Sequence, residues 1–279
     1  MDEHQTSTSA VETRSVQVST PAVATRFVLA TRNTGKIREM NEILFPLGVE
    51  TVSQKEAGVS VQVQETGETF AENAALKAKA VCEASGLPAI ADDSGLCVDA
   101  LNGGPGVYSA RYGGPELDDA GRCRLVLNSV RGQTNRQAHF RCSIAAAFPN
   151  GDMVTAEGVC DGLLAFAPMG KNGFGYDPIF LYPSMGKTFA EMDDAEKNAV
   201  SHRGKALTAF AQALEDYLAA QRKAAEEAKA IATLEKQAKH QKIIRKVRKS
   251  LRKPRCLRVK ATWNATWKRM RRYKKRLAL

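Results

Sequence analysis

The apolar and polar positions of this chain follow two periods, and both occur in RFVLATRNTGKIREMNEIL, which begins at Arg26. Residues 27–30 are a short apolar run of strand character, and residues 31–35 are polar and turn-like. From Lys36 the apolar side chains recur as on one face of a helix, at Ile37, Met40, Ile43 and Leu44. The pattern predicts a strand, a polar loop and a helix, with the loop at the helix N-terminus.

A second helical pattern covers GETFAENAALKAKAVCEASG, residues 67–86. Thr69 precedes the apolar positions and Glu72 lies three residues later, which is the spacing of a capping box. Gly86 and Pro88 end the pattern, because glycine favours the position after a helix and proline cannot continue one. We expect Thr69 to cap this helix.

The rest of the chain continues the alternation of strands and helices. Residues 88–95 predict a short strand, 138–148 and 154–166 a pair of neighbouring strands, and 173–183 a loop that enters a short strand. Residues 195–221 form one long helical pattern. Helices and strands in alternation predict an α/β fold with a twisted sheet.

Composition is typical of a soluble globular protein of one or two domains. The 279 residues are 43% hydrophobic and 25% charged, and no apolar run approaches the ~18 residues of a membrane span. Residues 1–25 contain acidic side chains and no apolar core of a secretory signal, so we interpret them as a flexible arm. The six cysteines form no C-x-x-C pair, which favours buried free thiols in a reducing cytoplasm.

The net charge of +11 is distributed unevenly along the chain. Residues 221–279 hold 22 Lys and Arg against 3 Asp and Glu, a net charge of +19. Residues 1–220 hold 19 basic and 27 acidic residues, a net charge of −8. The basic character belongs to the C-terminal segment alone, and the two parts need separate explanations.

Two adjacent carboxylates, Asp92 and Asp93, follow an apolar pair in AIADDSGLCVDAL. Neighbouring strand residues point to opposite faces, so one of two mid-strand aspartates would be buried without a partner, at a cost of several kcal/mol. We therefore expect both at a strand end that faces a cleft. With Glu65, Glu68 and Glu72 they offer oxygen ligands to a hard cation such as Mg²⁺. A solvated turn, which Asp-Ser-Gly also favours, is the alternative.

The polar loop at residues 31–36 precedes a helix, where backbone N–H groups and the helix dipole attract anions. Thr31, Asn33 and Thr34 add side-chain donors, and Lys36 adds a positive charge. The loop lacks the first glycine and the final Ser/Thr of a P-loop. An ordinary strand–helix connection explains the same residues.

Two later segments offer groups that suit a nucleotide. The loop GFGYDPIF, residues 173–180, combines two aromatic rings for stacking with glycines that allow a close backbone approach. In the basic set that follows, His202 can hydrogen-bond a base edge and Arg203 can bind phosphate or stack on a base; the set is Lys171, Lys197, His202, Arg203 and Lys205. A packed turn explains the first segment alone, and a solvated helix face explains the second. With the polar loop and the carboxylates, they supply what a nucleoside triphosphate pocket requires.

Five motifs, in order and with consistent spacing, resemble the Ham1/inosine triphosphate pyrophosphatase family, and its bacterial branch in particular. They are LATRNTGKIRE, ETGETFAENAALKA, PAIADDSGLCVDALNGGPGVYSARY, GFGYDPIF and EKNAVSHRGKAL. The resemblance covers residues 26–220, a pyrophosphatase domain between the arm at 1–25 and a basic helical extension at 221–279. Arg32 departs from the family, where a smaller residue is more familiar, without changing the expected chemistry.

The resemblance implies an elongated mixed sheet flanked by helices in two lobes, with the active cleft between them. It implies Mg²⁺-dependent hydrolysis of dITP, ITP and XTP to the monophosphate and pyrophosphate, commonly by a homodimer. By motif, Asp93 is general base and metal ligand with Asp92 beside it, Glu65 completes the metal site, and Lys77 reaches the phosphates. The other implied site residues hold the nucleotide: Thr31, Arg32, Asn33, Thr34, Gly35, Lys36, Ser94, Phe174, Gly175, Tyr176, Asp177, Lys197, His202 and Arg203.

These roles agree with the chemistry of the reaction. Water attacks the α-phosphorus while charge builds on the β,γ portion, and Lys36, Lys77 and Mg²⁺ offset that charge. A 6-keto purine needs a donor, for which His202 and Arg203, or backbone N–H groups near them, are the candidates, and adenine would leave that donor unpaired. Two alternatives stay open: a nucleic-acid-associated protein that uses the basic extension, and a Maf-type pyrophosphatase of other nucleotides. The net negative charge of residues 1–220 argues against the first alternative, and the SHRGKAL and GFGYDPIF segments argue against the second.

The extension at residues 221–279 lies outside the resemblance. Strong helix formers prolong the last helix, and Pro254 is expected to interrupt it. Its thin apolar stripe is Ile231, Leu234, Ile243, Ile244, Val247 and Leu251, and beyond it Trp263, Trp267 and Tyr273 alternate with Lys and Arg. Four interpretations fit: a nucleic-acid-binding arm, an amphipathic segment on an anionic membrane, a solvated extension without a partner, and a segment appended by a shifted reading frame or altered stop.

Overall fold

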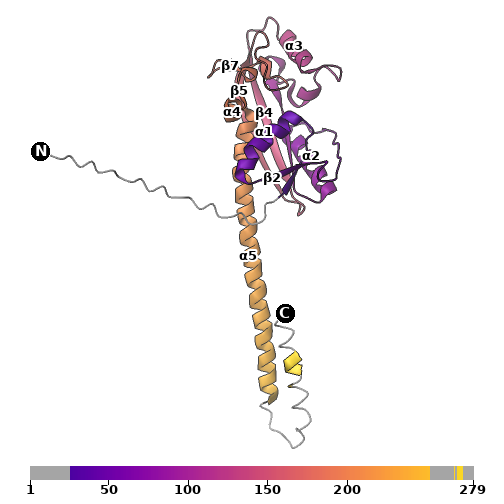
Figure 1. Cartoon of the computed structure of the whole chain (residues 1–279), viewed down its shortest axis with the longest axis vertical. Helices are drawn as coiled ribbons and strands as arrows, with labels where there is room; N and C mark the ends of the chain where they lie inside the picture. Colours follow the sequence, from indigo (N-terminus) through magenta and orange to yellow (C-terminus); the bar gives the residue numbers. More distant parts are fainter. Residues whose placement is uncertain (1–25, 252–266, 268, 273–279) are drawn as a thin grey trace, which may run out of the picture. The chain divides into compact units, whose positions relative to one another are not determined.

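A computed structural model of the chain describes residues 26–251, 267 and 269–272 (Figure 1). The chain divides into two compact units, Met1–Tyr217 and Leu218–Leu279. The expectations for the N-terminal arm, for Pro254 and for Trp263 and Tyr273 fall outside the described residues.

The first unit is built on a seven-stranded mixed sheet in the order β2-β1-β3-β4-β5-β6-β7. Strand β1 is parallel to both of its neighbours, and every later pair is antiparallel. The predicted α/β class and mixed sheet are confirmed. The strands are β1 (Arg26–Leu29), β2 (Glu50–Ser53), β3 (Ala89–Val98), β4 (Gln137–Ala147), β5 (Met153–Leu164), β6 (Phe180–Tyr182) and β7 (Lys187–Thr188).

Helix α1 (Thr34–Leu44) follows β1 as the sequence predicts, and it begins two residues earlier than Lys36. Asn33 caps it, because its Oδ1 accepts a hydrogen bond of 3.1 Å from the backbone N–H of Lys36. The buried side chains of the strand anchor this connection in the sheet. The polar loop therefore stands at a helix N-terminus, the geometry expected of an anion-binding loop.

Helix α2 (Phe70–Ser85) begins after its predicted cap. The Thr69 hydroxyl accepts a 3.1 Å hydrogen bond from the N–H of Glu72. The Glu72 carboxylate in turn accepts from the N–H of Glu68, at 2.8 Å, one residue before the position of a capping box. Gly86 ends the helix in the left-handed region, at φ 67°, where a side chain would be strained.

Strand β3 is longer than predicted, and the expectation that Asp92 and Asp93 end a strand is wrong. Both lie inside β3, where Asp92 pairs with Ile144 and Asp93 with Ser143 of β4. Both are buried. The prediction assumed that a carboxylate in mid-strand would lack a partner; the structure supplies cations from other elements on each face, as described below.

The single helix predicted over residues 195–221 is two helices, α4 (Asp194–Val200) and α5 (His202–Leu251). Ser201 between them is extended, with φ −70° and ψ 159°, and its hydroxyl accepts a 3.0 Å hydrogen bond from the N–H of Gly204. A Cβ at Gly204 would overlap the carbonyl oxygen of Asn198, so only glycine permits this close return of the chain. The break places His202 in the first turn of α5.

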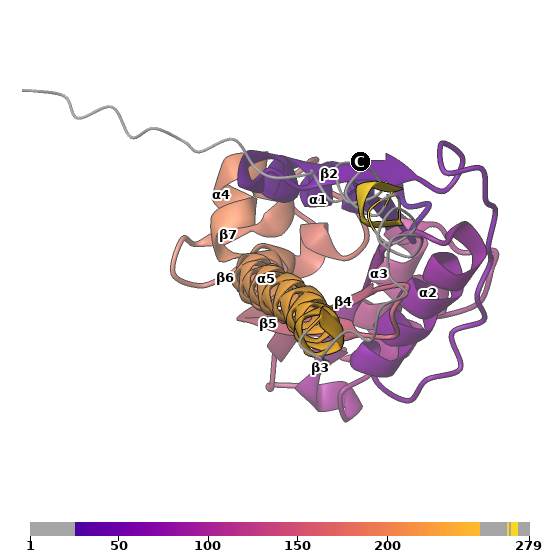
Figure 2. The ribbon, with the colours of Figure 1, turned by 90° about the horizontal axis from the view of Figure 1, so that it is seen from below.

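Helices cover both faces of the sheet (Figure 2). On one face α2 packs over the alanines and valines of β1 and β3, around Ala78 and Ala91. On the other face α3 (Asp119–Ser129) and the segment at 176–192 pack on β4 and β5 around Phe140. Helix α1 and the first turn of α5 contact the same face as α3, through Lys36 and Arg203.

The remaining described features concern helices and cysteines. Helix α5 runs on to Leu251, so the predicted helical extension is confirmed as far as the structure describes it. Among the described helices, none is long and apolar enough to cross a membrane. The cysteines of the described part are buried free thiols.

Candidate functional site

A cavity of about 250 Å³ gathers most of the predicted site residues. It opens between α1, the middle of β3, the loop at 173–177 and the α4–α5 break. Its walls include Asn33, Lys36, Glu65, Asp93, Ser94, Phe174, Gly175, Tyr176, Asp177, Lys197, His202 and Arg203. A second hollow of about 600 Å³ contains Arg32, Asn33, Thr34 and Gly35 together with Phe174. The structure thus brings together three predicted segments: the polar loop at residues 31–36, called the phosphate loop below, the aromatic loop at 173–180, and the basic residues of α4 and the first turn of α5, called the basic helix below.

Asp92 faces the side of the sheet that carries α1 and α5. Its Oδ2 accepts from Lys36 Nζ at 3.0 Å and from Arg203 Nε at 3.2 Å, and its side chain is fully buried. Burial favours the neutral acid, but the two cations outweigh it and hold the pKa of Asp92 below its ordinary value. Asp92 is therefore a fixed negative charge that orients two cations, which agrees with a supporting role beside Asp93.

Asp93 faces the opposite side of the sheet, toward α2. Its Oδ1 accepts from Lys77 Nζ at 2.9 Å, and its Oδ2 accepts from the side-chain amide of Asn73 at 3.3 Å. Burial raises the pKa of Asp93 and the nearby Glu65 carboxylate adds to it, against the opposing charges of Lys77 and Lys36. A carboxylate with a raised pKa at a cavity wall has a higher proton affinity than an ordinary aspartate, as a general base requires.

Glu65 is the second carboxylate of this corner. It accepts from Lys77 Nζ at 2.8 Å and from Arg111 at 2.9 Å. Burial opposes ionisation of Glu65, but hydrogen bonding to Lys77 and its charge prevail, so the pKa of Glu65 is lowered. Glu65 and Asp93 thus converge on one ammonium group.

The same convergence tests whether Mg²⁺ fits here. Two carboxylate oxygens already point at a single positive charge, and Mg²⁺ typically takes one or two protein carboxylates plus substrate phosphates. Within the described part of the chain, no group of three or more His, Cys, Asp or Glu side chains could hold a metal ion. The residues fit a metal that is completed by a ligand rather than one held by the protein alone.

A second buried network links the basic helix to α1. Glu39 contacts Arg203 and accepts from Lys197 Nζ at 2.8 Å, and Asp177 accepts from the same ammonium at 2.7 Å. Both acids are buried. Burial disfavours the charged form of Lys197, but the two carboxylates raise its pKa, so it stays an ammonium. Sequence reasoning missed Glu39; its position three residues after Lys36 on the same helix was the available indication.

Phe174 covers this network. The Lys197 ammonium lies 4.8 Å from the centre of the Phe174 ring, and the Arg203 guanidinium lies 5.6 Å from it. A Cβ at Gly35 would lie 2.6 Å from the ring, so a glycine in the phosphate loop permits the approach. The backbone N–H of Phe174 donates to Asp177 at 2.8 Å. The aromatic loop is therefore fixed to the basic helix.

His202 and Tyr176 occupy different environments although both line the cavity. The His202 ring stacks on Phe140 with centroids 4.5 Å apart, and its buried Nδ1 has no hydrogen-bond partner in the described structure. Burial lowers the pKa of His202 well below its usual value, so the ring is neutral at pH 7. The Tyr176 hydroxyl instead donates to the backbone carbonyl of Ser109 at 2.8 Å. The described structure thus leaves a buried polar atom of His202 unpaired, whereas the Tyr176 hydroxyl is already bonded to the protein.

The other predicted residues lie around these centres. The Thr31 hydroxyl accepts from the N–H of Asn33 at 3.2 Å and shapes the loop. Arg32 is exposed and donates to Ser60 at 3.0 Å. The Ser94 hydroxyl accepts from Arg203 at 2.8 Å, which adds a third contact to that guanidinium. Sequence reasoning did not find Asn73 or Arg111 either, because their contacts join segments distant in sequence.

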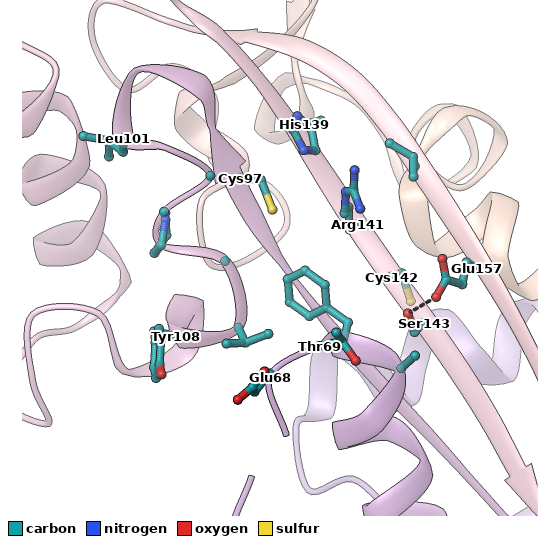
Figure 3. Close-up of a pocket in the computed structure, with 18 of the residues that line it drawn as sticks. Glu68, Thr69, Cys97, Leu101, Tyr108, His139, Arg141, Cys142, Ser143 and Glu157 are labelled. Carbon is teal, nitrogen blue, oxygen red and sulfur yellow. Dashed lines mark hydrogen bonds between the residues drawn. The ribbon is translucent and has the colours of Figure 1, made fainter. Parts of the chain in front are cut away.

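A larger cavity, of about 700 Å³, lies on the sheet face that carries α2 (Figure 3). Of the residues singled out as candidate ligands, only Glu68 lines it. His139 and Arg141 of β4 project toward it, and Ser143 donates to Glu157 at 3.1 Å across β4 and β5. Tyr108 stands on the opposite wall and is 60% exposed.

The chain belongs to the Ham1 family, whose sequence model matches residues 27–213. A dITP/XTP pyrophosphatase from Exiguobacterium sp. is 48% identical over 182 residues, which are 65% of this chain and 93% of that protein. One from Desulforamulus reducens is 50% identical over 184 residues, 65% of this chain and 92% of that protein. The solved structure of a HAM1 protein from Coxiella burnetii matches with a TM-score of 0.64 and 45% identity, over 68% of this chain and 98% of that one. The predicted family is confirmed.

Proposed function

We propose that the chain hydrolyses non-standard purine nucleoside triphosphates, namely dITP, ITP and XTP, to the monophosphate and pyrophosphate, and so removes them from the nucleotide pool. The observation that carries the proposal is a single cavity whose wall includes Asp93 and Glu65, Asn33 and Lys36 of the polar loop, and Phe174, Lys197, His202 and Arg203. The named relatives of the chain are dITP/XTP pyrophosphatases.

The reaction requires a water molecule to attack the α-phosphorus. In the proposed mechanism, Asp93 takes a proton from this water, the new P–O bond forms, and the bond from the α-phosphorus to the bridging oxygen breaks. Pyrophosphate leaves with the electron pair of that bond. The raised pKa of Asp93 suits this proton transfer. Lys36 and Lys77 are the cations that offset the charge on the departing phosphates.

Glu65 and Asp93 are the residues that would hold Mg²⁺. The bound ion would act as a Lewis acid on the phosphates. Both carboxylates contact Lys77 in this structure, so this lysine would lie beside the bound metal and the substrate phosphates.

Base selection follows from the neutral His202 and the cation Arg203. The 6-keto group of hypoxanthine or xanthine is a hydrogen-bond acceptor, whereas the 6-amino group of adenine is a donor. The guanidinium of Arg203 only donates, so adenine would bring two donors together and leave a buried one unpaired. We expect kcat/KM for dITP to exceed that for dATP by at least about 100-fold.

The test is pyrophosphate release with Mg²⁺ over dITP, XTP, dATP, dGTP, dTTP and dUTP, for the unaltered chain and two variants. Asp93→Asn is expected to lose turnover of dITP, because the amide cannot accept the proton. Asp161→Asn, a change at an exposed position of β5, is the matched control and should keep it. Near-normal hydrolysis by Asp93→Asn would reject the assigned base. Comparable kcat/KM for dATP and dITP would reject the substrate class, and preference for dTTP or dUTP would favour the Maf-type alternative.

We further propose that the chain acts as a homodimer through the face with the larger cavity (Figure 3). This face exposes Tyr108, Met153 and Val159, and exposed apolar side chains grouped on a sheet face are typical of an interface. It also carries Arg141 and Glu157, opposite charges that a two-fold axis could pair. Sedimentation equilibrium of Val159→Glu against the unaltered chain tests this surface; an unchanged mass would reject it.

We propose the cytoplasm as the site of action. Five described cysteines are buried free thiols, and such thiols persist in a reducing compartment.

A further inference from the structure

The C-terminal part of α5 is exposed on nearly all sides. From residue 221 to residue 250 every side chain is exposed except Ile244 and Val247, which are half-buried. Because this helix buries so little of its surface, packing does not account for its sequence, and its exposed side chains are the part that needs an explanation. The family match ends at residue 213, so this segment also lies outside the proposed enzyme function.

The charge of this surface is of one sign over its last four turns. Residues 236–249 contain seven Lys and Arg and no Asp or Glu. The acidic residues of the exposed helix, Glu226, Glu227 and Glu235, all precede this stretch. Within the residues that the structure describes, no carboxylate forms an ion pair with any of the seven. At 1.5 Å per residue the basic stretch is about 21 Å long.

Four of these cations form one stripe along the helix. Lys239, Lys242, Lys246 and Lys249 follow one another at intervals of three, four and three residues. With 100° per residue they lie within an arc of about 80°. A linear row of unpaired ammonium groups is complementary to a linear row of phosphates.

The apolar residues do not form a face that a membrane or a partner helix requires. Ile243, Ile244 and Val247 project to one side of the helix, whereas Ile231 and Leu234, two to three turns earlier, project to roughly the opposite side. An interfacial amphipathic helix needs a continuous apolar face along its length. The described helix has a continuous basic stripe and an interrupted apolar one.

We propose that the lysine stripe binds nucleic acid through its phosphates, without sequence preference. Residues 1–220 carry a net charge of −8, so they repel the same ligand and binding is expected from the extension alone. Residues 252–279 add twelve Lys and Arg and no acid, so the sequence continues the same charge beyond the stripe.

The salt dependence of binding shows how much the four lysines of the stripe are expected to contribute. Each phosphate neutralised on duplex DNA contributes about −0.9 to the slope of log K against log salt concentration. Four lysines therefore contribute about −3.6, which weakens their share of binding about 150-fold between 50 and 200 mM salt. Cations beyond residue 251 add to the total slope but not to the difference between variants.

The test is fluorescence anisotropy of a labelled 20-base-pair duplex of mixed sequence, titrated with the full chain at several NaCl concentrations. The stripe variant changes Lys239, Lys242, Lys246 and Lys249 to Gln, which keeps helix propensity. The control variant makes the same charge change at four exposed positions of the first unit: Lys55, Lys79, Arg124 and Arg131. Both should keep dITP hydrolysis, which shows that they fold.

The expected result is a slope about 3 to 4 units shallower and at least tenfold weaker binding at 100 mM salt for the stripe variant only. A slope within one unit of the unaltered chain would overturn the proposal, as would an equal loss in the control. Co-sedimentation with vesicles of 30% phosphatidylserine is the competing assay. Stripe-dependent capture by these vesicles without DNA binding would also overturn it, in favour of a membrane surface.

Discussion

Asp92 and Asp93 are adjacent carboxylates whose neutralisation we expect to have opposite effects on stability. Asp92 is buried between Lys36 and Arg203, and its pKa is lowered despite burial. Asp93 is buried beside Lys77, and its pKa is raised because burial prevails. Asp92→Asn should therefore destabilise the fold, whereas Asp93→Asn should leave it as stable as the unaltered chain or more so.

The expected loss of stability in Asp92→Asn follows from the two ion pairs of Asp92. Unit charges 3.0 and 3.2 Å apart attract with about 5 kcal/mol each at an effective dielectric constant of about 20. Burial of the carboxylate offsets several kcal/mol of this attraction, and removal of one partner of a buried ion pair costs about 3–5 kcal/mol. For a domain of this size the change corresponds to a fall in Tm of about 6–20 °C.

The pH dependence of the two variants also differs in sign. The folded pKa of Asp92 lies below its unfolded value near 3.9, so its contribution is present above that pH and is lost as pH falls through the folded pKa. The folded pKa of Asp93 lies above the unfolded value, so its contribution is present at low pH and is lost as pH rises through the folded pKa. Asn removes both dependences.

Urea unfolding of the unaltered chain and both variants, followed by circular dichroism at pH 7, pH 5 and pH 3, measures these free energies across both pH windows. Asp161→Asn serves as an exposed control that should stay within about 0.5 kcal/mol of the unaltered chain. The reasoning is refuted if Asp92→Asn lies within about 1 kcal/mol of the unaltered chain. It is equally refuted if Asp93→Asn is as destabilising as Asp92→Asn.

Two further predictions rest on single contacts. Lys77→Gln removes the ammonium that lies between Glu65 and Asp93 and would compete with Mg²⁺ for their oxygens. Calorimetry without nucleotide should therefore show tighter Mg²⁺ binding than in the unaltered chain. Unchanged or weaker binding would contradict a metal site on these two carboxylates. Gly204→Ala forces a Cβ against the carbonyl of Asn198, which should lower the free energy of unfolding by about 1–3 kcal/mol and also lower kcat/KM for dITP. Thermal unfolding measures the first effect, and an unaffected Tm would show that the break at Ser201 relaxes freely.

Local sequence was sufficient where the determining contacts are local. The Thr69 cap and the left-handed Gly86 are both settled within a few residues, and the structure confirms both predictions. Strand β2 buries only Val52 and so lacks the apolar run of β1, and α3 has little amphipathic character, so neither was predicted. The break at Ser201 depends on the return of Gly204 to Asn198, which a helical pattern does not reveal.

The candidate site was predictable as a set of residues but not as a geometry. Its motifs contain most of the residues that line the cavity, because each motif contributes a different wall. The error over β3 arose because the cations that permit buried aspartates lie at residues 36, 77 and 203, far from Asp92 and Asp93 in sequence. Glu39 was not predicted for the same reason, because its partners Lys197 and Arg203 are also distant in sequence.

The position of the two aspartates inside a strand explains how adjacent carboxylates acquire separate roles. Because side chains alternate across a strand, Asp92 meets Lys36 and Arg203 on one face while Asp93 meets Lys77 and Asn73 on the other. At a strand end both would share solvent and titrate alike. Within the strand, two direct cation contacts keep Asp92 ionised, whereas Asp93, beside Glu65 and one lysine, has the higher proton affinity that a base requires. The sheet itself therefore separates the structural charge from the proposed catalytic one.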